Sequence, residues 1–132
     1  VIRFSANRVV IEDSNPEFIL IGFADEMDGN YRDSLHFQRA IESDEQDVAL
    51  GMDQVYLERG IQAGAVYGGI TRVLLSRNRI AIDLDSMAAE KLGDREFEIM
   101  FELPPEQFQI MAKALECVFQ GSDVFNFNAI SE

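Results

Sequence analysis

The sequence is poor in several residue types that often carry chemistry. Its 132 residues include one cysteine, one histidine and three prolines, and tryptophan is absent. A single cysteine, Cys117, excludes an internal disulfide and suits a reducing compartment. The apolar runs are far shorter than the roughly 18–20 residues that span a bilayer, and no secretory pattern opens the chain. We therefore expect a soluble cytoplasmic protein.

Positive charge is also scarce. The chain has 24 acidic and 11 basic residues, which gives a net charge of -13. Such a surface repels nucleic acid and anionic membranes, and it attracts a basic partner and speeds its capture. Acidity can also serve solubility alone, so the net charge by itself leaves both interpretations open.

Apolar sequence, in contrast, is sufficient for a core. Hydrophobic residues make up 47% of the chain, and its length suits one domain over residues 1–132, with 121–132 as a C-terminal tail. Apolar patterning predicts strands at residues 2–11, 18–23 (buried on both faces), 35–41, 55–59, 66–75, 79–84 and 97–103. A polar loop is expected over 25–33 and a hairpin connection over 76–78. These elements predict an α+β fold with a largely antiparallel meander sheet of about six to seven strands.

Two helices complete the predicted fold. Residues 85–93 have an acid or serine at the start and glycine at the end, which predicts a short capped helix. Pro104-Pro105 opens a long C-terminal covering helix that Gly121 ends. An apolar stripe at helical spacing should face the core, with Cys117 as a buried packing residue. The stripe consists of Phe108, Met111, Leu115, Val118 and Phe119.

No pattern predicts catalysis, a metal or a cofactor. His36 stands alone in a strand, where a structural or surface role is expected. Residues 25–30 resemble a calcium loop, but the third and fifth positions carry no oxygen ligand. Gly68-Gly69 lacks the wider glycine spacing, lysine and helix of a phosphate-binding loop. The pair suits a sheet bend, or a glycine floor that displays Tyr67 to a partner. We expect a protein that is not an enzyme.

The most informative stretch is residues 35–73. It contains, in order, Phe37-Gln38-Arg39, an acidic block from Glu42 to Asp47, Gly51-Met52-Asp53, Tyr56-Leu57-Glu58 and Tyr67-Gly68-Gly69-Ile70. This order resembles the immunity protein 10 family of bacterial polymorphic toxin systems, and the resemblance extends over roughly residues 4–119. It implies a cytoplasmic protein that binds and silences a toxin domain.

Residue chemistry alone predicts the contact surface. Clustered acids would select a basic partner, and tyrosines would anchor the contact. The predicted toxin-binding residues are Asp44, Glu45, Asp47, Asp53, Tyr56, Glu58 and Tyr67. On this hypothesis, an acidic face covers a basic, catalytic surface of the toxin and excludes its substrate.

Two other functions stay open at this point. The acidity could serve solubility only, in a structural or assembly module that self-associates as a homodimer. A sheet edge or the tail residues Phe125-Asn126-Phe127 would then form the contact. Alternatively, a weak hydrolase could use paired carboxylates such as Asp44 and Asp47, which would require a deep polar pocket.

Overall fold

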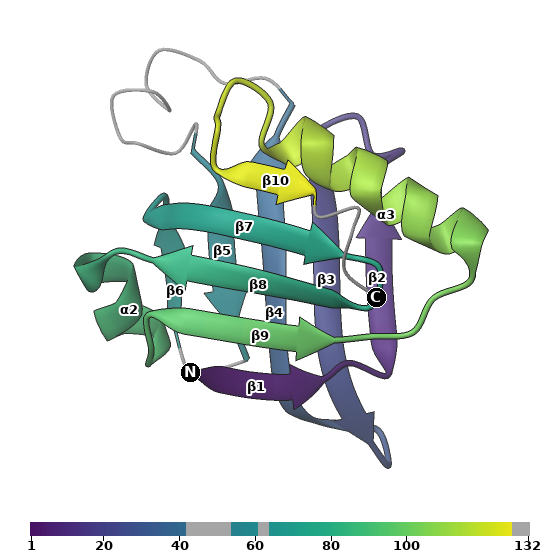
Figure 1. Ribbon diagram of the computed structural model, residues 1–132, viewed down its shortest axis with the longest axis horizontal. Coiled ribbons are helices and arrows are strands. Elements are labelled where there is room, and N and C mark those ends of the chain that lie inside the picture. Colours follow the sequence, from purple (N-terminus) through teal and green to yellow (C-terminus); the bar gives the residue numbers. More distant parts are fainter. Residues whose placement is uncertain (42–53, 61–63, 128–132) are drawn as a thin grey trace.

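Two five-stranded β-sheets and two helices make up the computed structural model, which describes residues 1–41, 54–60 and 64–127 (Figure 1). The mixed sheet has the order β1 (Ile2–Ser5), β9 (Glu96–Met100), β8 (Arg79–Leu84), β7 (Ile70–Ser76) and β10 (Phe125–Phe127). The antiparallel sheet has the order β2 (Arg8–Glu12), β3 (Phe18–Met27), β4 (Asn30–Ala40), β5 (Tyr56–Arg59) and β6 (Gly64–Tyr67). The helices are α2 (Ser86–Leu92) and α3 (Pro105–Val118).

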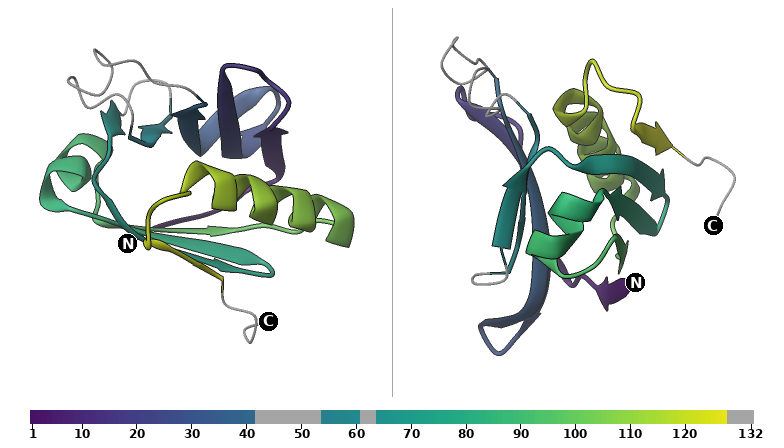
Figure 2. Two further views of the ribbon diagram at one scale, coloured as in Figure 1. Left: turned by 90° about the horizontal axis from the view of Figure 1, so that it is seen from above. Right: turned by 90° about the vertical axis from the view of Figure 1, so that its left-hand side faces the viewer.

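The two sheets face each other, and the strands of one run across those of the other (Figure 1). Their inner faces form a common core, in which α3 lies between the sheets at one end and contacts β2, β3 and β4 (Figure 2). Helix α2 contacts β6 and β8. The largest fully buried side chains are Phe23, Phe37, Phe97, Ile21, Leu35, Leu57, Leu75, Ile80, Ile82, Leu92, Ile99 and Met111.

The predicted α+β class and the antiparallel meander are confirmed, but the described residues form ten strands in two sheets. Two predicted strands are each split between the sheets: residues 2–11 form β1 and β2, and residues 66–75 form β6 and β7. Strand β10 is additional, and it pairs in parallel with β7. Apart from β10, the difference therefore arises where the chain crosses from one sheet to the other.

The first crossing lies at Ala6 and Asn7. The amide of Ala6 still bonds to Met100 of β9, whereas that of Asn7 bonds to Ala24 of β3. The Asn7 side chain also donates to the carbonyl of Glu26 and accepts from its amide. These bonds attach consecutive residues to different sheets, and a single strand over residues 2–11 is excluded.

The second crossing lies at Gly68 and Gly69, where the sheet-bend interpretation is confirmed. Both glycines have positive φ, +78° and +85°, which side chains other than glycine rarely adopt. A Cβ on Gly69 would lie 2.7 Å from the Cβ of Ala88, and one on Gly68 would meet the side chain of Gln54. The pair thus permits both the turn and the close approach of α2.

Two predictions about β3 and its surroundings are wrong. Residues 25–33 are not a loop, because β3 and β4 continue to a two-residue turn at Asp28-Gly29. Both turn residues have positive φ, 53° and 82°, as in the tight hairpin turns that suit twisted strands. Residues 18–23 are also not buried on both faces: Ile21 and Phe23 are fully buried, whereas Leu20 is half-buried on the other face.

The helix predictions are confirmed in their main features. Asp85 caps α2 by accepting from the amide of Ala88, and Gly93 ends it in the left-handed conformation. The whole apolar stripe of α3 is buried. However, α3 ends at Val118, before Gly121. Cys117 is exposed and not a packing residue, because it lies between the buried positions of the stripe.

The steric role of Gly69 can be measured. Gly69→Ala should lower the free energy of unfolding by about 2–4 kcal/mol, because left-handed strain adds to overpacking against Ala88. The matched control is Gly29→Ala, which has a similar φ but nothing within 4 Å of the added Cβ, so that only backbone strain of about 1–2 kcal/mol applies. Urea unfolding measures both. Equal losses would contradict the close-approach role.

Candidate functional site

Three of the predicted toxin-binding residues lie together on the outer face of the antiparallel sheet. Tyr56 and Glu58 belong to β5, and Tyr67 lies directly opposite Tyr56 on β6. Leu57 and Val66, which alternate with them, face the core. The other four predicted residues lie outside the part of the chain that the structure describes: Asp44, Glu45, Asp47 and Asp53.

Strand β4 adds to the same face. His36 lies opposite Glu58, and Gln38 lies opposite Tyr56. The ring centroids of His36 and Tyr56 are 6.0 Å apart, and those of Tyr56 and Tyr67 are 5.0 Å apart. We refer to His36, Tyr56, Glu58 and Tyr67 as the tyrosine–glutamate cluster.

The cluster faces away from the rest of the described molecule. Both helices lie on the inner side of the antiparallel sheet, and no described helix or strand covers its outer face (Figure 2). Tyr67 is 43% exposed, and the other three members of the cluster are half-buried among their neighbours. The cluster is therefore accessible and at the same time held on paired strands.

One short hydrogen bond organises the carboxylate of Glu58. The hydroxyl of Tyr56 donates to Oε1 of Glu58 over 2.6 Å. This hydrogen bond, aided by burial, raises the pKa of Tyr56 to about 12. Tyr56 therefore remains a hydrogen-bond donor throughout the physiological range, and it fixes the position of the carboxylate.

His36 is a member of the cluster that sequence reasoning missed. Burial lowers the pKa of His36, and the negative charge of Glu58 acts in the opposite direction. The available signal was the alternation of β4: Leu35 and Phe37 are core residues, so His36 must point to the outer face with Gln38.

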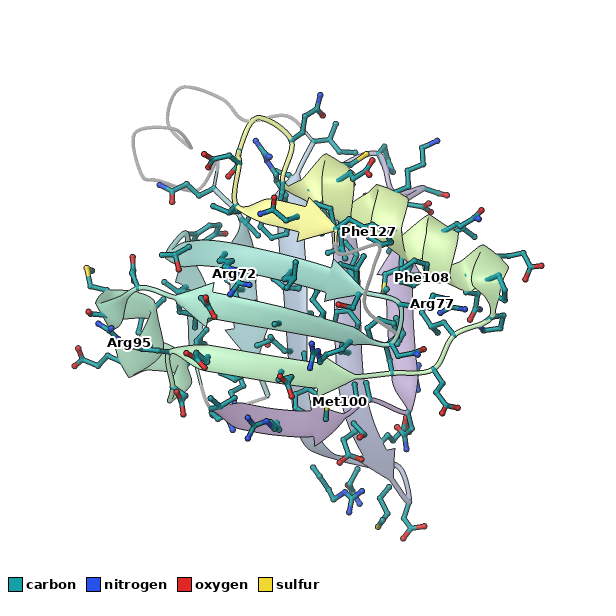
Figure 3. The ribbon with its side chains drawn as sticks, viewed as in Figure 1. Arg72, Arg77, Arg95, Met100, Phe108 and Phe127 are labelled. Atoms are coloured by element: carbon teal, nitrogen blue, oxygen red, sulfur yellow. The ribbon has the colours of Figure 1, made fainter. Side chains whose placement is uncertain are left out.

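The outer face of the mixed sheet offers a contrast, because its charges pair with each other (Figure 3). Glu98 is 3.2 Å from Arg3 and 3.7 Å from Arg79. Arg72, labelled in Figure 3, lies 3.4 Å from Asp83. The half-buried carboxylates of this face, Asp83 and Glu98, therefore already have cationic partners.

A comparison with protein families decides the broader identity. The family model described as Immunity protein 10 matches residues 5–109. The chain belongs to the immunity protein 10 family. This confirms the resemblance found in residues 35–73. The match includes strands β2 to β9 completely, whereas β10 and all but the last residue of β1 lie outside it. No curated protein and no solved structure matches the chain.

Other features of this immunity protein bear on the alternatives. A cavity of about 570 Å³ between α3 and β10 is lined by Arg77, Phe108, Lys113 and Phe127, and Glu116 is its one carboxylate (Figure 3). This cavity therefore holds no pair of acids, and Asp44 and Asp47 of the hydrolase alternative lie outside the described residues. Within residues 1–41, 54–60 and 64–127, no group of three potential ligands could hold a metal ion. None of the described helices is long and apolar enough to cross a membrane.

The coupling between His36 and Glu58 can be tested without any partner. In Glu58→Gln the pKa of His36 should fall below its wild-type value, because the charge that opposes the effect of burial is gone. As His36 is the only histidine, its ring C–H signals in a proton NMR pH titration are unambiguous. Glu12→Gln, on the same face of the sheet but on β2, should leave the titration unchanged. An unaltered midpoint in Glu58→Gln would exclude the coupling.

Proposed function

We propose that this immunity protein binds a cognate toxin domain of a polymorphic toxin system through the outer face of its antiparallel sheet. The observation that carries the proposal is the joining of Tyr56, Glu58 and Tyr67 into one accessible cluster on this face. Tyrosines of this kind anchor tight interfaces, since they bury a large area with few rotatable bonds. The protein acts in the cytoplasm, with no enzymatic activity of its own.

The proposed mechanism is occlusion of a basic toxin surface. The net charge of -13 attracts such a surface and speeds encounter. The acids of residues 42–53 lie between Ile41 and Gln54 in the sequence, and so between His36 on β4 and Tyr56 on β5. Once the toxin has docked, buried tyrosines slow its release, and its substrate is excluded from the covered surface.

The tyrosine anchor leads to a direct prediction. Tyr67→Ala should weaken toxin binding roughly 30-fold, as expected for the loss of an anchor residue worth about 2 kcal/mol. Ile110→Ala is the matched control: Ile110 is 47% exposed, close to the 43% of Tyr67, but it lies on α3. Calorimetry with the purified toxin domain and survival of toxin-expressing cells measure the effect. If the two variants bind equally well, this face is not the interface.

The acidic block should act mainly on the rate of association. The combined variant Asp44→Asn, Glu45→Gln, Asp47→Asn and Asp53→Asn should lower the association rate constant about tenfold at low salt and reduce its salt dependence. The control neutralises exposed acids elsewhere: Glu90→Gln, Glu102→Gln, Glu116→Gln and Asp123→Asn. Stopped-flow mixing at several salt concentrations compares the two variants. A response that follows total charge alone would refute a special role of the block.

The rival function, self-association through the tail, has one observation in its favour. Phe127 on the edge strand β10 is 50% exposed. Phe125, by contrast, packs in parallel against Phe119 with the ring centroids 5.9 Å apart, and β10 pairs with β7. Sedimentation equilibrium separates the two functions: a homodimer that Phe127→Ser dissociates, in a chain that gives no toxin protection, favours the rival.

A further inference from the structure

Glu58 differs from every comparable carboxylate in the described part of the chain. Each of the other half-buried carboxylates lies within ion-pair distance of a cation. These pairs are Asp25 with Arg32, Glu26 with Arg8, Asp33 with Arg59, Asp83 with Arg72, Asp94 with the N-terminal amine, and Glu98 with Arg3 and Arg79. Glu58 has only the neutral hydroxyl of Tyr56, on Oε1. Its Oε2 has no hydrogen-bond partner among the described residues.

The basic residues closest to Glu58 in the sheet are already engaged on the inner side. Arg59 follows Glu58 in the chain, but its guanidinium bonds to Asp33 over 3.2 Å and to the carbonyl of Leu92 over 2.8 Å. Arg39 on β4 donates to two backbone carbonyls at the end of α3. Both arginines occupy positions that alternate with the cluster and therefore point to the inner side of the sheet, so neither guanidinium pairs with Glu58.

The surroundings of Glu58 are those that bind organic cations in proteins. The rings of His36, Tyr56 and Tyr67 form a row on this face, with centroid separations of 6.0 and 5.0 Å, and the hydroxyl of the middle ring, Tyr56, bonds to Glu58. Ala65 on β6 lies opposite Glu58, two residues before the exposed Tyr67 on the same strand face, and its side chain is small. A cation over a tyrosine face gains from the ring quadrupole, and a nearby carboxylate adds a charge-assisted hydrogen bond.

We propose that the tyrosine–glutamate cluster is a socket for one basic side chain of the partner, an arginine or lysine that pairs with Glu58 and rests on Tyr67. The identity of the partner rests on the proposed function, but the chemistry of the socket belongs to this chain alone. A metal ion is a poor occupant, because the cluster supplies one carboxylate where hard cations require several oxygen ligands. The socket selects a basic side chain at one defined position, in addition to the general attraction between an acidic surface and a basic partner.

The socket can be probed without the toxin. The purified chain is titrated with N-acetylarginine amide, and N-acetylcitrulline amide serves as the neutral probe of the same shape, at constant ionic strength. The ring C–H signals of His36, the single histidine, report binding at pH 8, where its lowered pKa keeps the ring neutral. The arginine probe should shift these signals saturably, and the citrulline probe should bind about tenfold more weakly. Equal responses to both probes would overturn the proposal.

Substitutions in the cluster test whether the arginine probe binds there. Glu58→Gln and Tyr67→Ala should each abolish the preference for arginine over citrulline, whereas Glu12→Gln, on the same sheet face, should retain it. Circular dichroism confirms that each variant is folded. A preference that survives in Glu58→Gln would show that the arginine probe binds elsewhere and would refute the socket.

The same variants distinguish the two proposals. If arginine binds the wild-type chain and Glu58→Gln also loses toxin binding, both are supported. If arginine binds but Glu58→Gln and Tyr67→Ala keep full toxin affinity, the socket stands and the proposed toxin face fails. If arginine shows no preference but Tyr67→Ala weakens toxin binding, the socket fails and the toxin face stands.

Discussion

The structure depends on burying one face of each sheet against the other. Side chains alternate along a strand, so every core residue obliges its neighbours to point outward. Leu57 is fully buried between Tyr56 and Glu58, and Phe37 is fully buried next to His36. The core therefore holds the cluster in place. A partner that bound this face would meet side chains whose strands are already ordered, which lowers the entropic cost of binding.

Charge and shape act over different distances in this immunity protein. The net charge of -13 acts over many ångströms and affects encounter with a basic surface. The proposed socket in the tyrosine–glutamate cluster would act only on contact, through the carboxylate of Glu58, which the Tyr56 hydroxyl holds, and the exposed ring of Tyr67. The outer face of the mixed sheet would gain less from a basic partner, because its half-buried carboxylates Asp83 and Glu98 already lie beside arginines.

Prediction from sequence succeeded where the physical cause is local. The stripe of α3 and the caps of α2 depend on residues within one or two turns, and both are confirmed. The crossing at Asn7 was missed, and the one at Gly69 was predicted only as a sheet bend, because strand propensity does not show which sheet a strand joins. One signal was present: apolar core positions are even-numbered at Phe4 and Ala6 but odd-numbered at Val9, so the alternation breaks where β1 gives way to β2.

The candidate site, like the fold, was predictable from the sequence only in part. By itself, the sequence determined the acidity, the strands that carry Tyr56, Glu58 and Tyr67, and the family to which the chain belongs, because each depends on composition or on residues close together in the chain. Only the tertiary structure decided three features: His36 joins them, no described helix or strand covers the face, and Glu58 alone among the half-buried carboxylates of the described residues lacks a cation. Those features depend on pairing between strands and on where each arginine is engaged, and such distant contacts form only when the chain folds.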